Sequence, residues 1–390
     1  MKLAIYGGSF NPPHNGHVAA AMTVLRELNP DKLMIIPASI PPHKELTAGS
    51  PTPGERLILA QLAFADLPNT EVSDMEIVRE GRSYSADTVE AIKKQYPDAE
   101  LSVAVGTDML LSFETWYRFR YLLDNTTLAV FIRNDGEEAE VLAYADHLRS
   151  EYGAEIRFLR HDPLPMSSTD VREMLSRRMG ASYLPEKVYE RIIAAGDYDA
   201  RPELYWLREK VLEYLKPSRV AHVAGCETEA VSLAQHWVED PENAAEAAIL
   251  HDITKKLLLS EQLILCEEYG IINDNVESEN VKLLHAKTGA EMARRLFNVS
   301  DEVYNAIRWH TTGKPDMTLL EKIIYIADYI EPNRDFDGVD KLRELAYEDI
   351  DEAMLLGLRM SLEDITSSGI TPHPATVKAY DWYRSCTGKN

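Results

Sequence analysis

The chain has few cysteines and no long apolar run, and each shortage narrows what it can be. Of 390 residues only three are cysteines, Cys226, Cys266 and Cys386. So few, so widely spaced and odd in number, they argue against a disulfide framework and for a reducing compartment. No stretch approaches the roughly 20 apolar residues of a membrane helix, and the first residues do not resemble a signal peptide. We therefore expect a soluble, cytoplasmic protein without a membrane anchor.

Basic residues are also in short supply. Acidic residues outnumber Lys and Arg by 64 to 41, which gives a net charge of −23. Such a surface repels polymeric nucleic acid and anionic membranes, so we expect neither as a partner. Anionic small substrates would need basic groups placed locally, and the candidates are Lys44, Arg172, Arg219 and Arg334.

The apolar pattern changes along the chain. In the first half, short β-branched runs alternate with amphipathic stretches, which predicts a Rossmann-like, doubly wound α/β fold with a parallel sheet. A linker marked by glycine and proline follows at 194–202, and beyond it only helical patterns occur, such as 203–215 and 221–236. We predict two domains, 1–197 and 203–390, of which the second is an all-α bundle.

The most informative segment runs from Gly7 to His17, with the sequence GGSFNPPHNGH, between an apolar strand and a helix. Its glycines let the backbone approach a ligand closely, and a helix start presents free N–H groups to an anion. The rings of His14 and His17 can donate N–H groups to phosphoryl oxygens as negative charge develops. The alternative is a polar turn whose histidines only cap the helix, which the surrounding glycines and prolines disfavour.

A second anion-binding segment, MSSTDVR at 166–172, also starts a helix. Hydroxyl and N–H groups at a helix start suit a phosphate, and Arg172, one turn in, can bind two oxygens at once. Ligands of parallel α/β sheets bind at the carboxyl ends of the strands, which is where both segments fall. We therefore predict one shared nucleotide site.

Together these segments resemble the nucleotidyltransferase superfamily with the His-x-Gly-His signature, and the fuller string resembles its nicotinate mononucleotide adenylyltransferase branch. The resemblance implies in-line attack by the mononucleotide's phosphate on the α-phosphorus of ATP, with Mg²⁺ bridging phosphate oxygens. Pantetheine phosphate and cytidylyl transferases share this core, but Trp116 and the segment Ala86-Asp87-Thr88 favour a pyridine nucleotide as the acceptor.

The resemblance also implies roles for individual residues. Trp116 would stack on the nicotinate ring. Arg133 would bind the acceptor phosphate, but this role has weaker support because the family often has Arg-Pro where this chain has Arg133-Asn134. The implied catalytic residues are His14, His17, Lys44 and Arg172; the acceptor would meet Thr88, Trp116 and Arg133; and ATP would meet Gly8, Ser9, Phe10, His14, His17, Gly106, Asp108, Ser167, Ser168, Thr169 and Arg172.

The second half carries the adjacent pair His251-Asp252, with His222 before it and Asp328 after it, each in or at the end of an apolar helical run. These residues resemble the HD-domain phosphohydrolases. The resemblance implies that all four bind a divalent metal, iron or manganese, with positions left open for water and phosphate. Cys226 lies one turn after His222, and we expect it to be a small apolar filler.

Arg219, the run 252–255 and the later segments 326–334 and 372–380 resemble the HD subgroup that hydrolyses diadenosine tetraphosphate symmetrically to two ADP. Asp252 would then be catalytic, and His285 and His310 would bind nucleotide or a second metal. Two alternatives stay open: hydrolysis of deoxynucleotides or guanosine polyphosphates, and a nucleotide-sensing module. A homodimer is also left open. The implied nucleotide contacts are Arg219, Asp252, Thr254, Lys255, His285, His310, Thr311, Arg334, His373 and Thr376.

Overall fold

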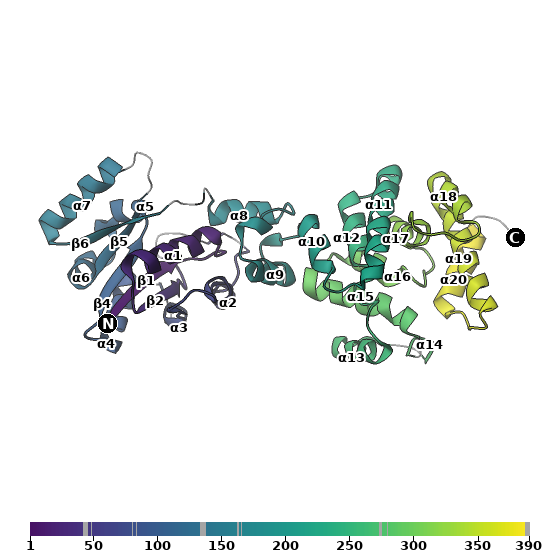
Figure 1. The fold of residues 1–390 in the computed structure, drawn as a ribbon, viewed down its shortest axis with the longest axis horizontal. Helices are drawn as coiled ribbons and strands as arrows, with labels where there is room; N and C mark the ends of the chain where they lie inside the picture. The colour runs from purple at the N-terminus through teal and green to yellow at the C-terminus, as the bar shows by residue number, and fades with distance from the viewer. Residues whose placement is uncertain are drawn as a thin grey trace. The chain divides into compact units, whose positions relative to one another are not determined.

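The computed structural model describes residues 1–41, 46–47, 49–79, 81–82, 84–132, 138–161, 164, 166–272, 275–278 and 280–386. The chain divides into two compact units, Met1–Ala200 and Arg201–Asn390 (Figure 1). Among the described residues, no helix is both long enough and apolar enough to span a bilayer.

The N-terminal unit is built on one six-stranded sheet. Its spatial order is β3-β2-β1-β4-β5-β6, and every neighbouring pair is parallel. The order reverses between β1 and β4, which is the switch point where such folds bind ligands. The strands are β1 (Lys2–Gly8), β2 (Lys32–Pro37), β3 (Thr70–Val72), β4 (Glu100–Val105), β5 (Thr127–Ile132) and β6 (Glu155–Arg160).

Helices cover both faces of this sheet, so the predicted doubly wound α/β fold is confirmed. On one face Ile5, Val103 and Val130 pack with apolar residues of α4, α6 and α7. On the other, α1 contacts β1 and α2 contacts β2. The helices of the unit are α1 (Asn15–Leu28), α2 (Pro53–Phe64), α3 (Met75–Val78), α4 (Ser85–Gln95), α5 (Thr107–Leu111), η1 (Phe113–Thr115), α6 (Phe119–Asn125), α7 (Glu138–Tyr152), α8 (Ser168–Leu175), η2 (Ala181–Tyr183), α9 (Glu186–Ala195) and η3 (Asp197–Asp199).

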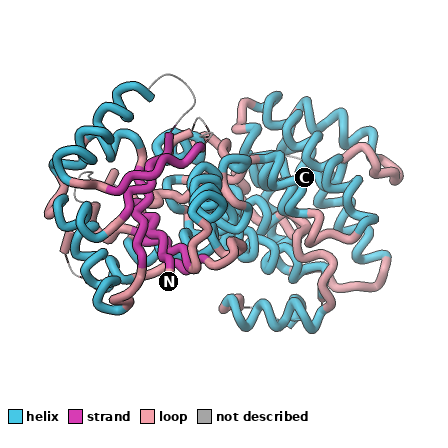
Figure 2. Tube along the Cα trace, turned by 60° about the vertical axis from the view of Figure 1, so that its left-hand side comes forward, coloured by secondary structure: helices cyan, strands magenta, loops and turns pink. Residues whose placement is uncertain are grey.

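The described part of the C-terminal unit contains helices and loops but no strand, as predicted, and Figure 2 shows the strands confined to the other unit. The helix α11 packs against α12 and α17, and α16 packs against α15 and α17. These helices carry the histidines and aspartates singled out above. The helices are α10 (Leu204–Val211), η4 (Pro217–Arg219), α11 (Val220–Trp237), α12 (Pro241–Leu250), α13 (Leu259–Tyr269), α14 (Asn275–Ser278), α15 (Val281–Phe297), α16 (Asp301–Trp309), α17 (Leu319–Ile330), α18 (Val339–Glu348), α19 (Ile350–Ser367) and α20 (Pro374–Cys386).

Candidate active sites

In the N-terminal unit, the loop after β1 fixes the proton position on both signature histidines. The backbone N–H of Gly16 donates to Nδ1 of His14 at 3.1 Å, and the backbone N–H of His14 donates to Nδ1 of His17 at 3.1 Å. Because each Nδ1 accepts a hydrogen bond, each neutral ring carries its proton on Nε2. The histidines therefore do cap α1, as the alternative interpretation held, and capping leaves each with an Nε2–H group to donate.

Both rings are also neutral near pH 7. Burial lowers the pKa of His14 to about 4. Burial, followed by the neighbouring His14, lowers the pKa of His17 well below its usual value. The two ring centroids are 3.8 Å apart. The pair thus presents two neutral N–H donors, which can bind phosphoryl oxygens without exchanging a proton with them.

The fold brings the second anion-binding segment onto this loop. The Ser168 hydroxyl donates to the backbone oxygen of Pro12 at 3.0 Å, and Nη1 of Arg172 donates to the backbone oxygen of Asn11 at 2.7 Å. Nη2 of Arg172 donates to the Thr169 hydroxyl at 3.0 Å. The Ser167 hydroxyl bonds Asp170 and caps α8. The two segments predicted from sequence therefore lie side by side.

A cavity of about 200 Å³ opens at the ends of β1, β2 and β4. Trp116 lines it, half-buried, with its ring 4.9 Å from that of Phe113. Thr88 also lines it, but its hydroxyl already donates to Oε1 of Glu76 at 2.6 Å. Both are therefore positioned at a ligand-sized hollow at the switch point.

The remaining predicted residues of this unit fall into four groups. Gly8 and Ser9 line the same cavity. Gly106 caps α5 with Asp108 in its first turn, and a Cβ on Gly106 would lie 2.7 Å from Oδ1 of Asp108. Phe10 is a core residue whose ring lies 5.2 Å from that of His17. Lys44 and Arg133 lie outside the described residues.

Arg56, on α2, is a buried residue of this region that we did not predict. Its side chain is 0% exposed and donates to the backbone oxygens of Ser9 at 2.8 Å, Ala38 at 2.7 Å and Ser39 at 2.7 Å. It thereby ties the end of β1 to the end of β2. The available signal was an arginine on the apolar face of an amphipathic helix, three and four residues before Leu59 and Ala60.

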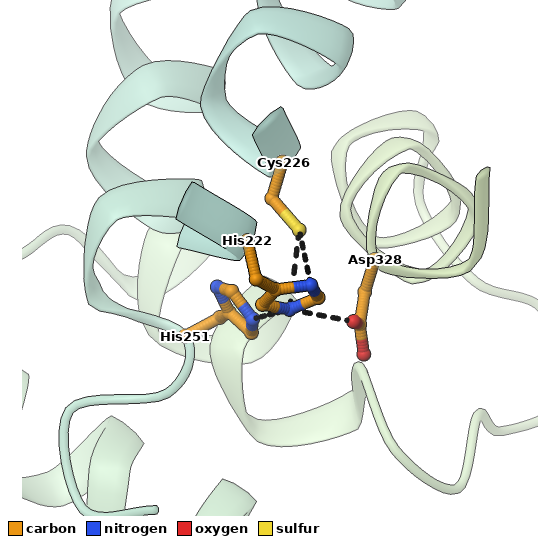
Figure 3. Close-up of side chains that lie close together, drawn as sticks. All are labelled: His222, Cys226, His251 and Asp328. Atoms are coloured by element: carbon orange, nitrogen blue, oxygen red, sulfur yellow. Dashed lines mark hydrogen bonds and ion pairs between the residues drawn. The ribbon is translucent and has the colours of Figure 1, made fainter. Parts of the chain in front are cut away.

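In the C-terminal unit, four side chains from three places in the sequence converge (Figure 3). Nε2 of His222 lies 3.3 Å from Nε2 of His251 and 3.1 Å from Oδ1 of Asp328. The fourth member is Cys226, whose Sγ lies 3.4 Å from the same nitrogen. The ligand atoms of all four lie within 4.8 Å of one another. Cys226 was expected to be a filler, and the structure places its sulfur within this cluster.

The tautomers show why this cluster suits a cation. Nδ1 of His222 donates to Oε1 of Glu331 at 3.1 Å, and Nδ1 of His251 donates to the backbone oxygen of Ala248 at 2.7 Å. With Nδ1 as the donor, each ring turns Nε2 toward the other ring and toward the Asp328 carboxylate. Three electron-rich atoms facing one another at this range fit a divalent metal, which would bind all three.

Asp252 lies between His251 of this cluster and His285. It is 0% exposed and forms an ion pair with Arg219. Its Oδ2 is 3.5 Å from Nε2 of His251. Its Oδ1 is 3.2 Å from Nε2 of His285 and accepts no hydrogen bond from the described residues. Burial alone would raise the pKa of Asp252, but His251 and His285 hold it well below its usual value. The carboxylate is thus ionised and has an oxygen left for a metal.

His285 and His310 extend this group. Their Nε2 atoms are 3.0 Å apart, and Nζ of Lys255 is 2.9 Å from Nε2 of His285. The Thr311 hydroxyl lies 3.2 Å from Nε2 of His310. His251, Asp252 and His310 form a second set of ligand atoms within 4.8 Å of one another. This arrangement offers ligand atoms to either of the two predicted partners, a nucleotide or a second metal.

Three predicted nucleotide contacts are used inside the unit. The Thr254 hydroxyl donates to the backbone oxygen of His285 at 2.9 Å and is fully buried. Nε2 of His373 lies 3.6 Å from Oε1 of Glu277. Thr376 is buried on α20. Their assignment to a nucleotide stays a prediction, and packing accounts for Thr254 and Thr376.

A cavity of about 480 Å³ adjoins the cluster, with Asp328 and Arg334 on its wall. Nη2 of Arg334 donates to Oδ1 of Asp328 at 2.7 Å. Tyr329 and Phe336 supply aromatic surface, with ring centroids 5.7 Å apart. A hollow with a guanidinium, a carboxylate and aromatic rings can accommodate a nucleotide beside this cluster.

The comparisons with known proteins divide the chain in the same way. Residues 5–174 match the family described as Cytidylyltransferase-like, and residues 219–333 match the HD domain. A probable nicotinate-nucleotide adenylyltransferase from Carboxydothermus hydrogenoformans is 33% identical over 198 residues, which are 50% of this chain and 98% of that relative.

For the other unit, the symmetrical bis(5'-nucleosyl)-tetraphosphatase of Bacillus subtilis is 38% identical over 175 residues, which are 44% of this chain and 92% of that relative. The crystal structure of a predicted HD superfamily hydrolase involved in NAD metabolism, from Clostridium acetobutylicum, is 36% identical and matches 48% of this chain and 100% of that one, with a TM-score of 0.47. Each relative thus corresponds to about half of this chain. The chain therefore belongs to two families in succession, with an N-terminal cytidylyltransferase-like domain of the nicotinate-nucleotide adenylyltransferase type and a C-terminal HD domain related to the symmetrical bis(5'-nucleosyl)-tetraphosphatases.

Proposed function

We propose that the N-terminal unit transfers AMP from ATP to nicotinate mononucleotide, giving nicotinate adenine dinucleotide and pyrophosphate. The observation that carries this proposal is the pair of Nε2–H donors on His14 and His17 beside the start of α8, at the switch point of the sheet. Donors at that place favour an anionic ligand with several phosphoryl oxygens.

In this reaction an oxygen of the mononucleotide's phosphate attacks the α-phosphorus of ATP in line, and the bond to the pyrophosphate oxygen breaks. The neutral rings of His14 and His17 stabilise negative charge on phosphoryl oxygens, and no proton has to move. We assign Arg172, and Lys44 by resemblance, to the leaving pyrophosphate. Mg²⁺ bound with ATP would neutralise further charge on the phosphates.

The acceptor specificity is assigned to the cavity beside these histidines. Trp116 offers a large aromatic face to the nicotinate ring, and Thr88 and Tyr84 line the same hollow. A relative named probable nicotinate-nucleotide adenylyltransferase supports this acceptor over phosphopantetheine or a cytidylyl reaction. The test is incubation of the purified chain with ATP and each acceptor. Among these acceptors, we expect only nicotinate mononucleotide to release pyrophosphate from ATP. Release only with phosphopantetheine would overturn the assignment.

For the C-terminal unit we propose symmetrical hydrolysis of diadenosine tetraphosphate to two ADP. His222, His251, Asp252 and Asp328 would hold the divalent metal, with iron or manganese as our prediction. When bound, the metal would supply Lewis acidity, which makes water a stronger nucleophile and draws charge from the phosphoryl group. Arg219, Arg334 and Lys255 would bind the polyphosphate oxygens, since they lie around the two aspartates.

The test is hydrolysis by the purified chain, metal-loaded and metal-stripped, with the products separated by chromatography. Two ADP per substrate, formed only with metal, are expected. Turnover of deoxynucleotides or guanosine polyphosphates instead would favour another HD hydrolase, and binding without turnover would favour a sensing module. The variant Asp252→Ala is expected to abolish hydrolysis and leave adenylyl transfer intact; loss of both activities would contradict independent sites.

We also propose that the chain works in a reducing, cytoplasmic compartment on small nucleotides. Its three cysteines are free thiols, and two of them are buried. Protein thiols that persist unpaired are typical of reducing compartments.

A further inference from the structure

Tyr198 connects the end of the N-terminal unit to the loop after β1. It lies in η3, close to the last residue of the unit, Ala200. Its hydroxyl donates to Oδ1 of Asn11 at 2.7 Å, across 187 positions of the sequence. Burial raises the pKa of Tyr198, so the hydroxyl keeps its proton near neutral pH. The sequence indicated only a linker at 194–202, and the structure gives this segment a direct contact with the signature loop.

Asn11 is 3% exposed, and three different segments hold its polar atoms. Its backbone oxygen accepts from Nη1 of Arg172 at 2.7 Å, its Nδ2 donates to the Ser50 hydroxyl at 2.8 Å, and its Oδ1 accepts from Tyr198. His14, which caps α1, follows three residues later. The position of Asn11 therefore affects both the guanidinium and the first histidine of the predicted phosphate site.

The backbone at Tyr198 adopts an unfavourable conformation. Tyr198 has a φ of 62° and Asp199 a φ of 53°, in the left-handed region that bulky L-residues rarely adopt. Such a conformation persists only where the surrounding structure fixes it, and it is concentrated at functional sites. A simple connection between two domains needs no strained residue, so the conformation supports a functional role for this segment.

We propose that Tyr198 is a positioning residue for ATP in the N-terminal unit: its hydroxyl holds Asn11, and through Asn11 the Arg172 guanidinium, where the triphosphate binds. The inference rests on the adenylyl transfer proposed above. A cavity of about 400 Å³ supports it, because Tyr198 lines this cavity together with Thr169 and Arg172.

The acceptor should be affected much less than ATP. Neither Tyr198 nor Asn11 is among the described residues that line the cavity beside Trp116. We therefore expect loss of the Tyr198 hydroxyl to weaken ATP binding and to leave binding of nicotinate mononucleotide almost unchanged.

The first test measures ATP binding to the full-length chain without an acceptor. Hydrogen exchange of the amides of residues 7–17, followed as ATP is added, reports this site separately from the C-terminal unit. Tyr198→Phe removes only the hydroxyl, and we expect about 10-fold weaker ATP binding because one hydrogen bond to a buried acceptor is lost. Equal affinity in the wild type and the variant would overturn this inference alone. A wild type that binds no ATP at this site would overturn the proposed adenylyl transfer as well.

Steady-state kinetics distinguish positioning of ATP from a general loss of stability. We expect Tyr198→Phe to raise the KM for ATP about 10-fold and to change the KM for nicotinate mononucleotide by less than about 2-fold. The matched control is Tyr144→Phe, since the Tyr144 hydroxyl donates to Oε2 of Glu114 at 2.9 Å in the same unit; its KM for ATP should match the wild type. Equal rises in both constants of Tyr198→Phe, or an equal rise for ATP in the control, would overturn the positioning role.

A double-mutant cycle tests whether Tyr198 acts through Asn11. In the Asn11→Ala background, adding Tyr198→Phe should raise the KM for ATP by less than about 2-fold further, because the partner of the hydroxyl is already absent. The full effect of Tyr198→Phe in that background would show that the hydroxyl does not act through Asn11 and would overturn the proposal.

Discussion

Glu331 accepts a hydrogen bond from Nδ1 of His222 at 3.1 Å, and this bond turns Nε2 of His222 toward the metal-ligand cluster. The other carboxylate oxygen, Oε2, accepts from the backbone N–H of Asn333 at 2.7 Å and from its side-chain amide at 2.9 Å. Burial acts to raise the pKa of Glu331, but Asn333 and His222 hold it below its usual value. Glu331 is therefore an ionised group that orients His222, the residue that we propose as a metal ligand.

Glu331→Gln should weaken metal binding about 10- to 100-fold, because an amide fixes the tautomer and raises the basicity of His222 less than a carboxylate does. Isothermal titration with Zn²⁺ measures the change. The matched control is Glu348→Gln, at an exposed glutamate of the same unit, which should bind as the wild type does. An unchanged affinity in Glu331→Gln would remove the orienting role.

Gly225→Ala should also weaken metal binding, because it changes the position of Glu331 without changing Glu331 itself. A Cβ at this helical glycine would collide with Oε2 of Glu331, so the carboxylate would be displaced from His222. Gly357→Ala on α19 is the control, since its Cβ would lie 3.7 Å from its nearest neighbours, an ordinary contact. Reduced Zn²⁺ affinity in Gly225→Ala alone is expected. Normal affinity in that variant would mean that Glu331 can shift without consequence.

Trp116→Ala should raise the KM for nicotinate mononucleotide about 10-fold while the KM for ATP changes little, because stacking contributes about 1 kcal/mol beyond the area buried. Steady-state kinetics with each substrate varied in turn separate the two constants. Trp116→Phe, which keeps an aromatic face, should recover most of the loss. Equal rises in both constants would indicate a disturbed fold rather than a lost stacking partner.

The N-terminal unit should lose stability as the pH falls from about 6.5 to 4. In this range the unfolded chain binds a proton at His14, whose ordinary pKa is about 6.5, while the folded chain does not because burial lowers the pKa to about 4. The unfolded state then gains protons and stability falls, by up to about 3 kcal/mol for this group.

The protection of the β1 amides from hydrogen exchange, measured as a function of pH, reports the stability of the N-terminal unit. His14→Asn, which keeps a side chain suited to capping α1, should reduce the slope between pH 6.5 and 4, and His17, whose pKa is also lowered by burial, should account for the rest. The exposed His236 supplies a control, since His236→Gln should leave the slope as it is. If stability depended on pH in His14→Asn as it does in the wild type, a group other than His14 would be responsible for the loss.

Arg56→Met should destabilise the N-terminal unit by about 3 kcal/mol, because three backbone oxygens would lose a charged donor inside the fold. Thermal unfolding measures the loss. Arg191→Met is a milder comparison, since the Arg191 guanidinium is partly exposed and pairs with Glu55 at 2.8 Å. Similar stability in the two variants would mean that the oxygens freed in Arg56→Met find water.

The sequence by itself determined the fold class of both units and the chemistry of the main groups. Alternating apolar runs predict a parallel sheet because both faces of its strands must be buried. His14 and His17, and the pair His251-Asp252, were found because they are close neighbours in the chain at element ends, where local backbone geometry alone positions them. Such local relationships need no knowledge of distant residues.

The tertiary structure decided what depends on distant contacts. Through the hydrogen bond from His222 to Glu331, it turns Nε2 of His222 toward His251 and Asp328. It also places the sulfur of Cys226 near that nitrogen and buries Arg56 at the ends of two strands. It also directs the Thr254 hydroxyl to the backbone oxygen of His285, a partner that the sequence did not indicate. Periodicity shows that a position is buried, but the direction of a side chain and the partner of its polar atom are set by the packing of segments far apart in sequence.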